Sequence, residues 1–480
     1  MRNAHRFISA IAALVILLAC SPNISAGADG AQSPTGWEPK QYDLEVHMYY
    51  DHEQLEGKSH ITLLNVSDRE LDTVNLLLYR LMKVTSVEGQ DGPLEFGQQV
   101  ETYDDYPRLQ KNCITVSLKK PVAPGEKCIL SIDYEGYLLG MDEAYGYVKE
   151  TIDPAFTMIR SDSDAYPMIG LPSRKETRCT PQFRFTYDAK ITVPDSLSVA
   201  NGGRLAGKTS EEGETTWHYV SKVPSWRMDF AIAKYKSFEH GRNTVFCLAE
   251  DANRGPRIIK EMDRTIDLYT KWFGPLQNDH GLAIIEIPMG YGSQTDVTTI
   301  IQQAEAFKDD KHLYELYHEI SHKWNVPTTD KLPPRIEEGL ACFLQALTVE
   351  ELEDRAFLDK YMEWDLGYIR KAYDGHPERA GVPIAHLGDE GVEGLSYTVG
   401  AVFFRLLYGI VGQEKFNSII GDFYADKYTT GADVDDFVAY MRKDTGPRVK
   451  KLIDEWIYGG KYSDYIQKNM SIGEMAALYE

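Results

Sequence analysis

The spacing of apolar residues changes about halfway along this chain, and that change constrains the fold more than any other feature. Between residues 41 and 238 apolar and polar residues alternate, as at Leu44, Val46 and Met48. Beyond residue 257 apolar residues recur every three or four positions. Alternation is typical of half-buried strands, and the longer spacing is typical of amphipathic helices. We therefore expect a multidomain α+β protein, with an N-terminal antiparallel β-sandwich-like domain followed by a mainly α-helical domain.

The length of 480 residues favours more than one domain, because a single hydrophobic core rarely grows to that size. We expect the β domain to span residues 39–240 and the helical domain residues 241–480. The formal net charge is −22. An acidic surface repels phosphate backbones, so we expect no nucleic-acid partner. No feature of the sequence predicts an oligomeric state.

The N-terminus has the features of an export signal. Two arginines precede an apolar run at residues 8–18, which is shorter than a membrane-spanning helix requires. The run ends in the letters LLAC, which resemble a bacterial lipobox with Cys20 as the residue that carries the lipid. We expect a signal peptide at residues 1–19, a flexible tether at residues 20–38, and an exported protein that is lipid-anchored to a membrane of the bacterial cell envelope. The alternative is plain secretion, with Cys20 present by chance.

The chain has six cysteines but no Cys-x-x-Cys pair, so a cysteine-type zinc site is not expected. Cys113 and Cys128 flank one predicted hairpin, and an exported protein could form a disulfide between them. The simpler interpretation is that most of the cysteines are small buried apolar residues.

The string His318-Glu319-Ile320-Ser321-His322 lies in a segment with helical spacing. Side chains four positions apart on a helix stand on one face about one turn apart, so the two imidazoles can bind one metal ion. Glu319 lies beside them and can accept a proton from a water molecule that the metal activates. The competing interpretation is a surface helix with two unrelated histidines. It is weaker, because a match of this kind is rare by chance.

A catalytic zinc site needs a third protein ligand and an open position. Glu337 and Glu338 are the candidates at the start of the next predicted helix, and fifteen residues separate His322 from Glu338. That spacer allows the chain to turn back, so a carboxylate on a neighbouring antiparallel helix can reach the metal. We assign the metal to His318, His322 and Glu338, and we assign Glu337 to the first helical turn, where a carboxylate complements the helix dipole. Gly339 would let two helices approach closely.

Short strings in a characteristic order accompany these residues. In chain order they are Ser225 to Ala231, Trp272 to Pro275, His322 to Trp324, Glu338 to Ala341, Tyr397 to Gly400, Asp435 to Phe437 and Trp456 to Tyr458. Together they resemble the aminopeptidase-N and leukotriene-hydrolase family of gluzincin zinc metallopeptidases. The likeness covers roughly residues 40 to 460.

The resemblance implies a thermolysin-like catalytic domain with one Zn²⁺ ion per chain, and hydrolysis of peptide bonds in a peptide or protein substrate. It implies that Glu319 is the general base and that Tyr397 donates a hydrogen bond to the oxyanion that develops on the peptide carbonyl. It also implies a loop whose backbone aligns the substrate as an added strand. That substrate-binding loop consists of Gly290, Tyr291, Gly292, Ser293 and Gln294.

The sequence departs from the family's pattern in three places. The spacer between His322 and Glu338 is shorter than is usual in the family. Gln294 stands where the family's exopeptidase loop has a glutamate that pairs with the free amino terminus of the substrate, and a neutral amide cannot make that charge-assisted bond. Asp296 or Glu286 could replace it. The chain also ends soon after the last matching string, so we expect a short member without the C-terminal helical domain and with a more open cleft.

Two functions are compatible with these residues. The first is an aminopeptidase-like zinc peptidase with altered recognition of the substrate's N-terminus. The alternative is a non-catalytic or weakly active peptide-binding lipoprotein that retains the metallopeptidase fold. The intact His318, Glu319, His322 and Tyr397 favour the enzyme, because binding alone requires no general base.

Overall fold

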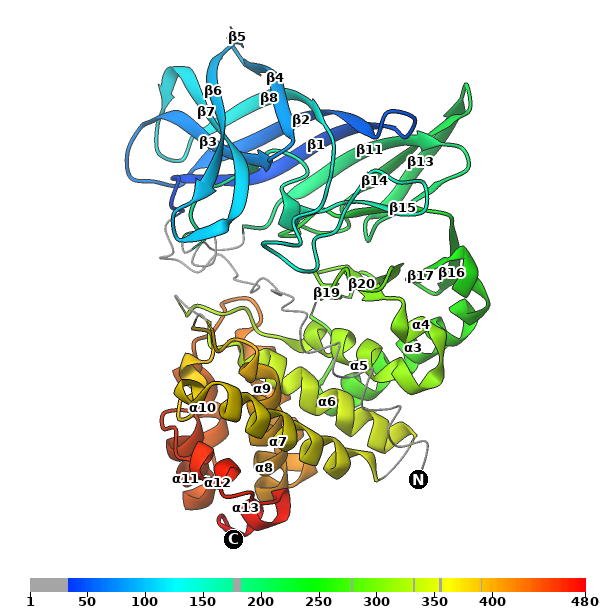
Figure 1. The fold of residues 1–480 in the computed structure, drawn as a ribbon. Helices are drawn as coiled ribbons and strands as arrows, with labels where there is room; N and C mark the ends of the chain where they lie inside the picture. Colours follow the sequence, from blue (N-terminus) through cyan, green and yellow to red (C-terminus); the bar gives the residue numbers. More distant parts are fainter. Residues whose placement is uncertain are drawn as a thin grey trace.

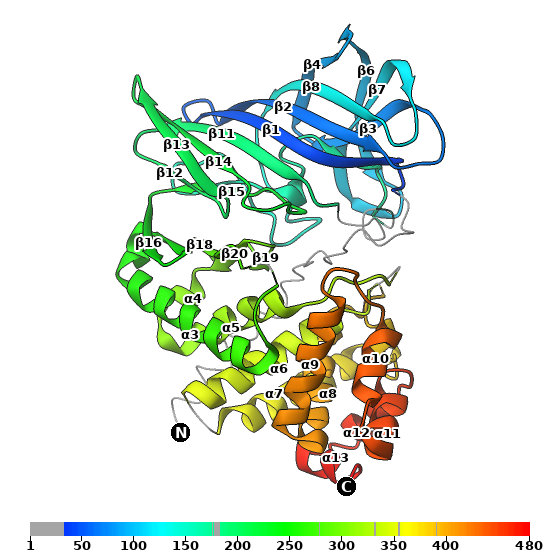
Figure 2. The ribbon, with the colours of Figure 1, turned by 180° about the vertical axis from the view of Figure 1, so that it is seen from behind.

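The computed structural model describes residues 33–174, 176, 183–277, 279–330, 333–353, 356–389 and 391–480. Strands in several sheets form the N-terminal part, and helices form most of the C-terminal part (Figure 1). Seen from behind, a smaller sheet with its covering helices lies between the large β region and the remaining helices (Figure 2). This order of elements confirms the expected α+β class with its β domain first.

The largest sheet has eight strands, and its neighbouring strands are antiparallel except for one parallel pair in its middle. In sheet order the strands are β13 (Arg204–Glu211), β14 (Glu214–Val220), β11 (Thr186–Pro194), β1 (Trp37–Tyr49), β2 (Gln54–Asn65), β8 (Lys127–Gly136), β4 (Met82–Gly89) and β5 (Gly92–Pro93). The parallel pair is β1 with β11. In β1 the alternating residues Leu44, Val46 and Met48 are buried, as their spacing predicts.

Two smaller antiparallel sheets complete the β region. One contains β10 (Met168–Ile169), β3 (Leu71–Tyr79), β7 (Tyr106–Val122) and β6 (Glu95–Tyr103). The other contains β12 (Ser198–Ala200), β15 (Phe230–Ala233) and β9 (Thr157–Ile159). Leu44 of the eight-stranded sheet and Leu76 of the four-stranded sheet belong to one buried core, which is the packing of a β sandwich.

The predicted hairpin around Cys113 and Cys128 is wrong in one respect. Cys113 lies in β7 and Cys128 in β8, and these two strands belong to different sheets. Both thiols are free. The sequence identified the turn between the two strands, but β7 pairs with β3 and β6, and β8 pairs with β2 and β4.

A five-stranded sheet follows in the chain. Its order is β16 (Tyr235–His240), β17 (Asn243–Leu248), β18 (Ala283–Ile287), β20 (Thr299–Gln303) and β19 (Gln294–Thr295). β17, β18 and β20 are parallel, and β19 pairs with β20 in the antiparallel direction at the sheet edge. The expected domain boundary at residue 240 falls between β16 and β17, which pair with each other. The division into domains stays a prediction.

The helices contribute one continuous buried core. They are α3 (Gly255–Phe273), α4 (Glu305–Lys308), α5 (Leu313–Ser321), α6 (Ile336–Leu352), α7 (Phe357–Gly375), α8 (Leu395–Val411), α9 (Gln413–Lys427), α10 (Val434–Arg442), α11 (Gly446–Trp456), α12 (Tyr462–Gln467) and α13 (Ile472–Ala477). Among the described residues, no helix combines the length and the apolar character needed to cross a bilayer.

Helices α6 and α8 pack backbone against backbone. A Cβ atom on Gly339 would lie 2.5 Å from the Cα atom of Gly400, so both positions require glycine. The close approach that Gly339 predicted therefore occurs, with α8 as the partner. It brings the start of α8 next to the start of α6.

Candidate metal centre

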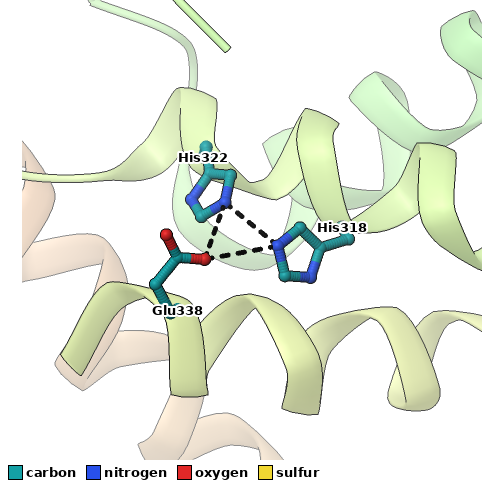
Figure 3. Close-up of side chains that lie close together, drawn as sticks. All are labelled: His318, His322 and Glu338. Carbon is teal, nitrogen blue, oxygen red and sulfur yellow. Dashed lines mark hydrogen bonds and ion pairs between the residues drawn. The ribbon is translucent and has the colours of Figure 1, made fainter. Parts of the chain in front are cut away.

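Two histidines and one glutamate face one another between α5 and α6 (Figure 3). His318 lies in α5, His322 follows the end of that helix, and Glu338 lies in the first turn of α6. The two Nε2 atoms are 3.2 Å apart. Oε2 of Glu338 lies 3.5 Å from Nε2 of His318 and 3.6 Å from Nε2 of His322. The structure thus brings the three residues that we assigned to the metal together.

These separations fit one small cation. Zn²⁺ binds imidazole nitrogen and carboxylate oxygen at about 2.0–2.2 Å, and two such ligands at a tetrahedral angle lie about 3.4 Å apart. Oε2 of Glu338 is buried and has no hydrogen-bond partner among the described residues. Buried polar atoms are normally satisfied, so an unsatisfied carboxylate oxygen facing two imidazoles indicates a place for a cation. The residues present fit a catalytic Zn²⁺ ion.

Amide side chains hold the outer nitrogens of both rings. Nδ1 of His318 lies 2.9 Å from Oε1 of Gln345, whose Nε2 donates to the hydroxyl of Tyr361. Nδ1 of His322 lies 2.8 Å from Nδ2, the amide nitrogen of Asn325. Donation from Nδ1 of His318 to the Gln345 oxygen leaves Nε2 of that ring free to bind a metal, whereas the Asn325 contact fixes only the orientation of the His322 ring.

The surroundings keep Glu338 and His322 in the forms that bind a metal. Burial alone would raise the pKa of Glu338, but the nearby His318 and the charges of His322 and Arg335 outweigh burial and hold this pKa well below its usual range. Burial lowers the pKa of His322 to about 4. An ionised carboxylate and a neutral imidazole are the metal-binding states of these groups.

Glu319 lies on α5 beside the three ligands and is 7% exposed. Its Oε2 accepts a hydrogen bond of 2.8 Å from the hydroxyl of Thr295 in β19. Burial raises the pKa of Glu319 to about 7, although the charge of His318 and the bond from Thr295 oppose the rise. A carboxylate with a pKa near neutral can both accept and release a proton.

Tyr397 reaches the same centre from the first turn of α8. Its ring stacks on the ring of His318, with 6.3 Å between the centroids and 11° between the planes. Its hydroxyl oxygen accepts a hydrogen bond of 2.8 Å from Nη2 of Arg335. The same nitrogen donates to Oε1 of Glu338 at 3.0 Å. The phenol is therefore in place beside two of the three ligands.

The predicted substrate loop follows β18 and ends on Gln294, the first residue of β19, and Arg160 ties it to the β region. Arg160 follows β9 directly, and its side chain is completely buried. Its guanidinium donates to the carbonyl oxygens of Tyr291 at 2.7 Å and Gly292 at 3.3 Å. It also donates to Oε1 of Gln294 at 2.7 Å. The loop and the side chain of Gln294 are therefore held by a cation from a distant strand.

The remaining loop residues are fixed by β20. The N–H of Gly290 donates to Oε1 of Gln303 at 2.9 Å, and Oγ of Ser293 accepts from the N–H of Gln303 at 3.0 Å. Gly290 and Gly292 have φ values of +89° and +70°, a region that residues with a Cβ rarely adopt. The loop leads directly into Thr295, whose hydroxyl bonds Glu319.

The two acidic residues considered as replacements for the missing glutamate bind elsewhere. Oδ1 of Asp296 accepts from the N–H groups of Thr298 and Thr299, both at 2.7 Å. Oε2 of Glu286 accepts from the N–H of Leu248 in β17 at 2.8 Å. Asp296 therefore caps the turn between β19 and β20, and Glu286 in β18 binds the backbone of the neighbouring strand β17.

Several residues of this centre were not found from the sequence. Gln345, Arg160 and Arg335 are single polar residues, and no spacing or motif distinguishes them. Asn325 follows His322 by three positions, and this closeness in the sequence is the one signal that could have identified it as a partner of the His322 ring. Cys20 lies outside the described residues.

The known proteins to which this chain is similar are peptidases. No family model matches the chain. Aminopeptidase A of Gloydius brevicauda is 22% identical over 453 residues, and glutamyl aminopeptidase of Bitis rhinoceros is 26% identical over 453 residues. Each alignment covers 88% of this chain and 46% of the relative. The chain therefore spans about half the length of these curated relatives.

Solved structures agree with the sequence relatives. The M1 zinc metallopeptidase from Deinococcus radiodurans superimposes with a TM-score of 0.63 at 17% identity, over 91% of this chain and 96% of that chain. A mutant of the same peptidase bound to a Tyr-Ser-Ala substrate also gives a TM-score of 0.63. At this identity the likeness concerns the fold. The chain is thus similar in sequence to aminopeptidases and in fold to M1 zinc metallopeptidases, in agreement with the family that its strings resemble, and its His-His-Glu group fits a catalytic Zn²⁺ ion.

Proposed function

We propose that this chain is a zinc-dependent peptidase that binds one Zn²⁺ ion through His318, His322 and Glu338. The observation that carries the proposal is the unsatisfied, buried Oε2 of Glu338, which faces both imidazole nitrogens at 3.5 and 3.6 Å. A bound Zn²⁺ ion supplies Lewis acidity, which polarises the scissile carbonyl and makes a water molecule more acidic. The peptidase relatives support the same chemistry.

The chain's own side chains then perform the proton transfers. Glu319 accepts the proton of the attacking water, and we assign this role to Oε1 because Oε2 accepts the hydroxyl of Thr295. Tyr397 donates its phenolic proton in a hydrogen bond to the carbonyl oxygen as negative charge develops there. Glu319 afterwards delivers its proton to the amine that leaves.

The alternative function, a peptide-binding lipoprotein without catalysis, is not favoured. Binding would not require a buried carboxylate beside the metal ligands. Glu319 is such a group, and its Oε2 is oriented by Thr295. Both features suit proton transfer.

We further propose that the substrate's N-terminus is not recognised by a loop carboxylate. Gln294 offers an amide, and its Oε1 already accepts from Arg160 at 2.7 Å. The guanidinium of Arg160 is ion-paired with Asp162 at 3.0 Å and with Glu150 at 3.2 Å. A neutral amide whose oxygen is already engaged offers no charge-assisted bond to a substrate ammonium group. Peptides with a neutral N-terminus, either acylated or internal, should therefore be cleaved at least as well as peptides with a free one.

A pair of fluorogenic peptides tests both parts of the proposal. The two peptides share one sequence, and one has a free amino terminus while the other is N-acetylated. We expect the acetylated peptide to be cleaved at least as efficiently as the free one, with both activities lost on chelation and restored by Zn²⁺. Cleavage of the free peptide alone would disprove the altered recognition. Cleavage of neither peptide by protein that holds stoichiometric zinc would favour the binding lipoprotein.

We also propose that the protein is exported and anchored through a lipid on Cys20, on the basis of the lipobox-like string before it. The variant Cys20→Ser should move the protein from the detergent phase to the aqueous phase on detergent partitioning of whole cells. Cys113→Ser is the matched control and should remain in the detergent phase. If the Cys20 variant partitions like the unaltered chain, the lipid anchor is excluded.

A further inference from the structure

Arg335 occupies an unusual backbone position directly before α6. Its φ and ψ angles are 59° and 36°, in the left-handed region that residues with a Cβ rarely adopt. Glycine or asparagine would fill such a position with less strain. Strained residues of this kind persist at functional sites, where the side chain has a role that the backbone alone does not explain.

The side chain of Arg335 lies inside the metal centre. It is 7% exposed, and its Nη2 donates both to Oε1 of Glu338 at 3.0 Å and to the hydroxyl of Tyr397 at 2.8 Å. The guanidinium also lies 5.4 Å from the centroid of the Tyr397 ring. The ring of Tyr397 in turn stacks on His318. One cation therefore contacts a metal ligand and the phenol together.

The two contacts have separate physical consequences. Because Oε1 of Glu338 is held by Arg335, the carboxylate cannot rotate freely and its Oε2 stays directed at the two imidazoles. Because the oxygen of Tyr397 accepts from Arg335, the phenol's own proton must point to a different acceptor. A cation at this oxygen also polarises the O–H bond, so its hydrogen bond to a developing oxyanion becomes stronger.

We propose that Arg335 is a positioning residue that couples metal binding to oxyanion stabilisation. It orients Glu338 for the metal and it orients and polarises Tyr397 for the carbonyl oxygen of the substrate. The second half rests on the proposed peptidase function, whereas the first half concerns metal binding alone. A purely structural role, in which Arg335 only balances the buried charge of Glu338, would involve no coupling to Tyr397.

The substitution Arg335→Met removes both hydrogen bonds and keeps a long side chain. At saturating zinc we expect kcat to fall about 100-fold with little change in KM, in line with the loss of one oxyanion-stabilising group. The affinity for Zn²⁺, measured by competition with a chromogenic chelator, should fall about 10- to 100-fold, as is typical when a partner of a metal ligand is lost. Arg335→Lys keeps the charge and should recover part of both losses.

Two comparisons separate positioning from structural support. Arg370→Met is the matched control, since Arg370 is a partly buried arginine that donates to the carbonyl oxygens of Ile466 and Met470. It should leave kcat and zinc affinity unchanged. In a Tyr397→Phe background, Arg335→Met should lower kcat by only about threefold, because the group through which it acts is already absent.

Each outcome decides the proposal. Equal losses of kcat in the two backgrounds, or no loss at saturating zinc, would overturn the coupling to Tyr397. An unchanged zinc affinity in Arg335→Met would overturn the orientation of Glu338. If the unaltered protein binds zinc but hydrolyses no peptide, the proposed function fails, and the chelator competition still decides whether Arg335 orients the ligand.

Discussion

Replacing Glu319 by glutamine is expected to abolish peptide hydrolysis while the metal stays in place. The amide has nearly the same shape and can still accept the hydroxyl of Thr295 through its oxygen, but it cannot take up a proton from water. General base catalysis contributes roughly 10²–10⁴-fold, so kcat should fall by at least that factor. Steady-state kinetics on the better of the two fluorogenic peptides and metal analysis of the same preparation provide the two readouts.

Glu315→Gln is the appropriate control for this variant. Glu315 lies on the same helix one turn earlier and is equally buried, at 7% exposure, but it belongs to no ligand group among the described residues. Its substitution should leave kcat within a few-fold of the unaltered protein. If Glu319→Gln retained a tenth of the activity, or lost its metal, the general-base role would be wrong.

The second large effect is expected for Glu338→Gln, which should lose the metal itself. The amide can still satisfy Arg335, so the buried arginine keeps a partner and the fold is maintained. A neutral amide oxygen is a much weaker zinc ligand than a carboxylate, and the charge that attracts the cation disappears. Zinc affinity should therefore fall by more than the roughly 10- to 100-fold that is typical for loss of an outer partner.

Glu337→Gln makes the same chemical change one position earlier and serves as the control. Glu337 was assigned to the first turn of the helix, and it is not part of the His-His-Glu group. Zinc affinity should be unchanged within a few-fold in this variant. Comparable losses in both variants would show that general acidity near α6, and not Glu338 as a ligand, attracts the metal.

Periodicity predicted the fold well because burial acts locally on each strand and helix. The alternation at Leu44, Val46 and Met48 corresponds to a strand with one buried face, and the four-residue spacing of His318 and His322 corresponds to neighbouring positions at the end of α5. These patterns depend only on which face of a strand or helix packs against the core. They can therefore be recognised directly in the sequence.

Side-chain contacts between residues that are far apart in the chain cannot be recognised in this way. Arg160 contacts Gln294 across 134 positions, and Arg335 contacts Tyr397 across 62. Each contact depends on how sheets and helices are assembled, and a single arginine in a sequence gives no indication of its partner. The assignment of β7 and β8 to different sheets was missed for a related reason, since a local turn joins the two strands but β8 pairs with β2 and β4, which lie earlier in the chain.

The central claim is that His318, His322 and Glu338 converge on one cation, and X-ray absorption spectroscopy of the purified protein tests it most directly. We expect one zinc ion per chain, with imidazole nitrogen and carboxylate oxygen at about 2.0–2.2 Å, and loss of that ion in Glu338→Gln. A protein that binds no stoichiometric metal, or one whose metal is retained with an unchanged ligand shell in that variant, would contradict the account.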